Sequence, residues 1–131
     1  MPSAKSPVDP SAVAHAPSKG RPRFTFTVPE ACRINPDDPA TLTMVPITLG
    51  EEQMALKAHN AGGLPLMYEL AKMSLVAVDG RPLDWAGGAR DTFLEKVSPP
   101  IRQLIQSAWA KVNVPAKEAD EAFLASMRTE I

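Results

Sequence analysis

Cysteine and histidine are scarce in this 131-residue chain. It has one cysteine, Cys32, and two histidines, His15 and His59. A single cysteine cannot form an intrachain disulfide, and two distant histidines cannot supply a histidine-based metal cluster or catalytic triad. The sequence favours Cys32 as a packed or half-exposed side chain and His59 as a positive charge near a helix C-terminus, not as catalytic groups.

Long apolar runs and blocks of like charge are also missing. No segment approaches the roughly 20 apolar residues that a membrane span needs, and the N-terminus lacks the continuous apolar stretch of a secretory signal. The formal net charge is −1, and the charged residues, 22% of the chain, form no single-sign block in its folded part. We therefore expect a cytoplasmic protein with no membrane association and no dedicated nucleic-acid surface.

Phosphate-binding loops and acid–base pairs have no clear sequence support. The pairs Gly62-Gly63 and Gly87-Gly88 lack the spacing of a phosphate-binding loop, and no lysine follows in the Walker pattern. Asp37-Asp38, and Asp79 with Asp84, lie in turn sequences, where aspartate bonds to the backbone. We assign no catalytic, cofactor-binding or metal-binding residue, expect no cofactor, and do not expect an enzyme.

Proline is abundant, and its distribution divides the chain. Five of the 14 prolines lie in residues 1–22, where the rest is mostly small or polar and cannot bury enough apolar surface to offset the entropy of ordering. Residues 1–23 hold four basic residues and one acidic residue, whereas the remainder holds 10 basic and 14 acidic ones. We predict a flexible basic arm over 1–22, either solvated or ordered against another subunit, and a single domain over 23–131.

Three segments of the predicted domain have strand patterns. Phenylalanine and valine alternate with threonine over 24–28, the period of a half-buried strand, and a second strand is predicted over 42–47. Pro46 cannot donate to a ladder, so this strand should lie at a sheet edge or be bulged there. Asp79-Gly80 predicts a tight hairpin. The strands could form one sheet or two.

Helix signals occupy the rest of the domain. Thr48 and Glu51 have capping-box spacing, so a helix should begin there and run to about His59. Apolar residues over 101–112 follow i, i+3, i+4, i+7 and i+11, a strongly amphipathic pattern. Other helices are predicted from Pro65 to about Met73, around 93–97, and from near Pro115, where Ala119, Phe123 and Met127 share one side. The predicted class is α+β, with a small sheet or hairpins and four to five helices.

Methionine, leucine and tryptophan supply the candidate partner-binding residues. Met67, Leu70 and Met73 lie at helical spacing, and methionine forms adaptable binding surfaces as well as core. Trp85 in the hairpin and Trp109 on the amphipathic helix could anchor an interface where they are exposed. We predict these five as partner-binding residues, with core packing as the alternative for each.

The predicted elements follow a recognisable order. They are a strand ending in Val45-Pro46-Ile47-Thr48-Leu49, a helix from Glu51, the hairpin Leu75-Val76-Ala77-Val78-Asp79-Gly80, a helix from Pro99-Pro100-Ile101, and a terminal segment Phe123-Leu124-Ala125-Ser126-Met127. This layout, over residues 24–127, resembles small tail-morphogenesis proteins of tailed bacteriophages, the tail assembly chaperones in particular. The resemblance assigns no individual residues.

The resemblance implies binding to other phage tail proteins. A chaperone would hold a tape-measure or tail-tube protein in an assembly-competent state in the host cytoplasm. The alternative is a minor tail or baseplate component that stays in the virion and docks through the arm. Either protein could also bind further copies of itself.

Overall fold

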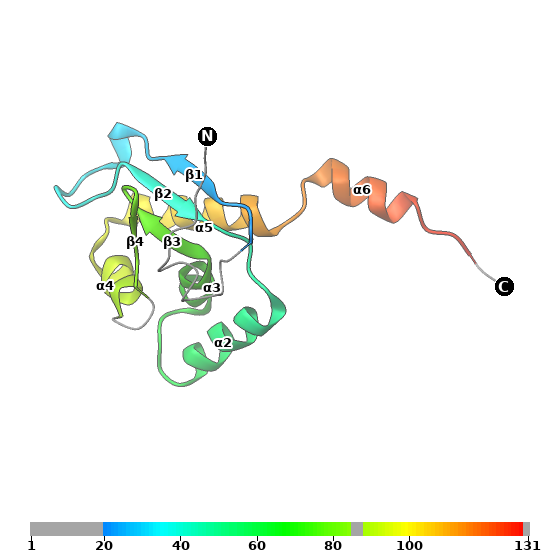
Figure 1. Cartoon of the computed structure of the whole chain (residues 1–131), viewed down its shortest axis with the longest axis horizontal. Coiled ribbons are helices and arrows are strands. Elements are labelled where there is room, and N and C mark those ends of the chain that lie inside the picture. Colours follow the sequence, from blue (N-terminus) through cyan, green and yellow to red (C-terminus); the bar gives the residue numbers. More distant parts are fainter. Residues whose placement is uncertain (1–19, 85–87, 130–131) are drawn as a thin grey trace.

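The computed structural model describes residues 20–84 and 88–129. Within them, four strands form one antiparallel sheet in the order β1 (Phe24–Thr27), β2 (Thr41–Met44), β3 (Leu75–Val78) and β4 (Arg81–Pro82). The helices are η1 (Glu30–Cys32), a 3-10 turn, and α2 (Leu49–Asn60), α3 (Leu66–Ser74), α4 (Ala89–Lys96), α5 (Pro99–Asn113) and α6 (Lys117–Ala125). Figure 1 shows the sheet and the first four α-helices gathered in one body, from which α6 projects. The predicted α+β class is confirmed.

The core lies where α5 meets the sheet. Ile101 and Ile105 are fully buried one turn apart on α5, and they share a cluster with Leu42, Met44 and Leu75 from the two central strands. The amphipathic spacing predicted over 101–112 therefore forms the main helix-to-sheet contact.

β2 departs from its predicted position in the sheet. The strand ends at Met44, so Pro46 lies beyond it and removes no ladder hydrogen bond. β2 pairs with β1 on one side and β3 on the other, and its register with β3 shifts between Thr43 and Met44. The predicted edge position is wrong, whereas an irregularity is present two to three residues before Pro46.

The turn from β3 to β4 is the hairpin predicted at Asp79-Gly80. Both residues have positive φ, +52° and +78°, which matches the twist that a two-residue hairpin requires. The Asp79 carboxylate also accepts hydrogen bonds from the amides of Ala40 and Thr41, at 2.7 and 3.0 Å. This side chain therefore ties the hairpin to the start of β2.

Arg21 already belongs to the folded body, although the predicted arm extends to residue 22. Its guanidinium donates to the Pro46 carbonyl at 3.1 Å and pairs with the Glu51 carboxylate at 2.6 Å. Glu51 also completes the predicted capping box, accepting from the Thr48 amide while its own amide donates to the Thr48 hydroxyl. Residues 1–19 lie outside the described residues.

Two junctions between consecutive helices have opposite geometry. Between α2 and α3, Gly62 has a φ of +93°, and the two helices double back and pack together. Between α5 and α6, Val114 and Ala116 are extended on either side of Pro115. No residue of α6 is buried, and the helix stands away from the body (Figure 1).

Candidate functional site

The five predicted partner-binding residues do not converge on an exposed surface. Met67 and Leu70 are half-buried on α3, whereas Met73 is 4% exposed and packs inside the body. Trp109 is half-buried against the core from α5, and Trp85 lies outside the described residues. Met73 therefore follows the core-packing alternative, and the partner-binding role of the five residues stays a prediction.

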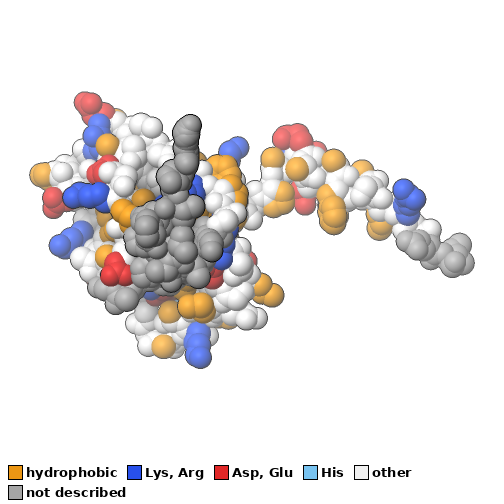
Figure 2. All heavy atoms as spheres, viewed as in Figure 1, with side chains coloured by type: hydrophobic (Ala, Val, Ile, Leu, Met, Phe, Trp, Pro, Cys, Tyr) orange, Lys and Arg blue, Asp and Glu red, His pale blue; other side chains and the backbone are white. Residues whose placement is uncertain are grey.

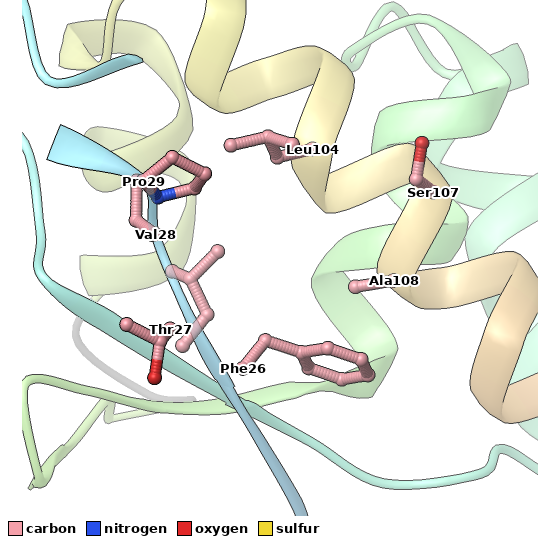
Figure 3. Close-up of a pocket in the computed structure, with 8 residues that line it drawn as sticks. Phe26, Thr27, Val28, Pro29, Leu104, Ser107 and Ala108 are labelled. Carbon is pink, nitrogen blue, oxygen red and sulfur yellow. The ribbon is translucent and has the colours of Figure 1, made fainter. Parts of the chain in front are cut away.

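An apolar groove of about 260 Å³, here called the β1–α5 groove, opens between the first strand and the long helix. It is lined by Phe26, Thr27, Val28, Pro29, Leu42, Leu104, Ser107 and Ala108. Figure 3 shows Phe26 beside Ala108 at one end and Pro29 beside Leu104 at the other. Because Thr27 and Ser107 are the only polar side chains in this lining, the groove is suited to apolar side chains.

Among the described residues, the two most exposed large apolar side chains, Phe123 and Met127, lie on α6 and just after it. Phe123, Leu124 and Met127 are 73%, 63% and 81% exposed. Figure 2 shows hydrophobic atoms along the projecting helix. The predicted four-residue spacing holds for Ala119, Phe123 and Met127. None of these three side chains is buried against the body. Apolar side chains left exposed together on one helix are typical of a surface that another protein covers.

A cluster of charged side chains joins α3 to α4. The Lys72 ammonium lies 2.6 Å from the buried Glu69 carboxylate and 2.7 Å from Asp91. Burial acts to lower the pKa of Lys72, but its hydrogen bonds and ion pairs with Asp91 and Glu69 outweigh burial, so the pKa is raised. Glu69 also accepts from the Leu64 amide at 2.8 Å. One ammonium between two carboxylates leaves these three side chains with a net charge of −1, and their ion pairs link α3 to α4.

Arg90 extends this link toward the other helices. It is buried on α4 and donates to the Lys72 carbonyl at 3.0 Å. Burial lowers the pKa of Arg90 to about 10, against the raising effect of Glu51 and Asp84. The guanidinium remains a cation at neutral pH and contributes to the contacts among the helices.

The described residues contain neither a group of side chains placed to bind a metal ion nor a helix able to span a membrane. Within 20–84 and 88–129, no three His, Cys, Asp or Glu side chains are placed to hold a metal ion. No helix in the same ranges is both long enough and apolar enough to cross a membrane. His59 instead bonds through Nδ1 to the Leu64 carbonyl at 2.9 Å, beside the turn between α2 and α3.

Comparison with known proteins gives no relative for this chain. No protein-family model, curated protein or solved structure matches it. The β1–α5 groove and the exposed face of α6 are therefore interpreted from their own geometry.

Proposed function

We propose that the protein is a protein-binding factor in phage tail morphogenesis, acting as a tail assembly chaperone for a tape-measure or tail-tube protein. The layout over residues 24–127 supports the assignment to tail morphogenesis. The geometry of α6 supports protein binding. The alternative is a minor tail or baseplate component that stays in the virion and docks through residues 1–22.

The observation that carries protein binding is the position of α6. Phe123 is exposed on α6 and Met127 two residues after its end, and no residue of α6 is buried against the described body. A short amphipathic helix gains its stability from burial of its apolar face, so a partner groove would both order α6 and bury these side chains. α6 is the segment that we expect to enter the partner.

The test compares two double variants of α6. Phe123→Ser with Met127→Ser removes the apolar face, whereas Lys117→Ser with Glu121→Ser makes the same replacement at the same spacing about a third of a turn away around the helix. We expect the first pair alone to lower recovery of tape-measure and tail-tube proteins by roughly tenfold or more in pull-downs from phage-infected cells. Circular dichroism should show both variants folded, since α6 contributes no buried residue.

Mass spectrometry of purified particles separates the two roles. A chaperone binds its client in the infected cell and is absent from finished particles. Retention in particles at a fixed copy number would instead establish the structural alternative, and deletion of residues 1–22 should then abolish incorporation. Equal recovery of tail proteins by the two double variants would overturn binding through α6.

A further inference from the structure

The β1–α5 groove and the exposed face of α6 have complementary charge as well as apolar surfaces. Arg23, just before β1, precedes Phe26 by three residues, and Lys111 follows Ala108 by three on α5, so the chain places both near the Phe26–Ala108 end of the groove. Both cations are exposed, and neither forms an ion pair with a described residue. Two cations therefore flank this end of the groove in sequence, although neither is among the residues that line it.

α6 carries the matching charges at its own N-terminal end. Glu118, Asp120 and Glu121 outnumber Lys117 there, while Phe123 and Met127 follow toward the C-terminus. A helix laid along the groove from the end flanked by these cations would place its acidic turn near Arg23 and Lys111 and its apolar side chains over the apolar lining. Opposite charges arranged in this way set the orientation of docking.

The junction before α6 argues against its docking onto its own chain. A helix that doubles back after a short connection commonly uses a left-handed residue, as Gly62 does between α2 and α3. Val114 is β-branched and precedes Pro115, so it is held in the extended region, and proline itself cannot adopt positive φ. The extended junction directs α6 away from its own body (Figure 1).

We propose that α6 of one copy docks in the β1–α5 groove of a second copy, and that the second copy returns the same contact. Such an exchange is closed, because each copy contributes one helix and one groove. The dimer would cover Phe123 and Met127 until a client protein competes for α6. This role as a client-free resting state rests on the proposed function, whereas the dimer itself is independent of it.

The oligomeric state of the full-length protein tests the contact from both sides. Ser107 is exposed and lines the groove, so Ser107→Trp should fill the groove. The control, Gln103→Trp, places the same side chain at an exposed position of α5 that does not line the groove. We expect a dimer for the unchanged protein and for Gln103→Trp in sedimentation equilibrium. Ser107→Trp, and Phe123→Ser with Met127→Ser, should each weaken dimerisation by roughly tenfold or more. A dimer undisturbed by both would overturn the proposal, as would a protein that stays monomeric throughout the micromolar range.

Cross-linking distinguishes docking between copies from docking within one copy. In a Cys32→Ser background, a Ser107→Cys chain is mixed with an Ala122→Cys chain. A disulfide between the two chains supports the exchange, whereas a disulfide formed within a single Ser107→Cys/Ala122→Cys chain at high dilution overturns it.

Client recovery keeps this proposal separate from the proposed function. Ser107→Trp leaves α6 intact, so loss of the dimer with retained or increased client recovery supports the resting dimer. The opposite result is also informative. If both Ser107→Trp and the Phe123→Ser/Met127→Ser variant remain dimers while the latter loses client recovery, the exchange is rejected and the proposed function stands.

Discussion

The two helix pairs of this protein, α2 with α3 and α5 with α6, differ mainly in the residues that connect them. Ala61-Gly62-Gly63 reverses the chain, and α3 then buries Ala71 and Met73. Val114-Pro115-Ala116 keeps the chain extended, and α6 buries no residue. Both α3 and α6 are amphipathic helices. The residues that connect each helix to the one before it therefore determine whether its apolar face is buried within the same chain.

Alanine substitution of one methionine in each region should give the largest difference in the free energy of unfolding. Met73 is 4% exposed on α3, whereas Met127 is 81% exposed beyond α6. Met73→Ala should lower the free energy of unfolding by about 2 to 5 kcal/mol, because it opens a cavity in packed surroundings. Met127→Ala should change it by less than about 0.5 kcal/mol. Urea denaturation measures both, and equal effects would remove the distinction between a covered and an uncovered helix.

The reversal between α2 and α3 can be broken at Gly63. A Cβ there would collide with the Glu69 carboxylate and the Ala58 carbonyl, so Gly63→Ala should cost about 1 to 3 kcal/mol of stability. Gly50→Ala is the matched control on α2, where a Cβ meets only the Thr48 hydroxyl at 3.8 Å. Because alanine suits a helix better than glycine, the control should leave stability unchanged or raise it by up to about 1 kcal/mol. Thermal unfolding that ranked the two variants in the opposite order would reject a tight approach at Gly63.

Most of the fold could be predicted from local sequence signals. The Thr48–Glu51 capping box, the Asp79-Gly80 turn and the apolar spacing over 101–112 each depend on residues a few positions apart, and each is present in the structure. The position of β2 could not be predicted in the same way. Pro46 suggested an edge strand, but the strand ends before Pro46, and its pairing with β1 and β3 depends on residues distant in sequence.

The candidate site was less predictable than the fold. Its groove combines residues 26–29 with 104–108, and no periodic pattern links segments so far apart. The apolar face of α6 was visible in the sequence, but periodicity cannot distinguish a face buried in the same chain from a face left exposed. Val114-Pro115, which excludes a left-handed reversal, was the signal that could have separated the two.

The entry into α5 contrasts with its exit, and acid should reveal the difference. Asp38 accepts hydrogen bonds from the amides of Ile34 and Asn35, both at 2.9 Å, and from the Ser98 hydroxyl at 2.7 Å. The Ser98 amide donates to the same carboxylate at 3.2 Å. Burial acts to raise the pKa of Asp38, but these bonds outweigh burial and the pKa is lowered. An ionised side chain thus holds the start of α5 to the loop between η1 and β2, whereas the end of α5 leads to the uncovered α6.

Asp38→Asn should lower the free energy of unfolding by about 1 to 2 kcal/mol at neutral pH, because the new amide group can no longer accept from every donor. A carboxyl whose pKa is lower in the folded state contributes stability above its unfolded pKa of about 3.9 and loses it as pH falls through the folded value. The stability gap between wild type and Asp38→Asn should therefore narrow below about pH 4. Asp37→Asn, at the exposed neighbour, removes the same charge and controls for net charge. A gap of constant size down to pH 2 would mean that the ionised carboxylate does not hold the start of α5.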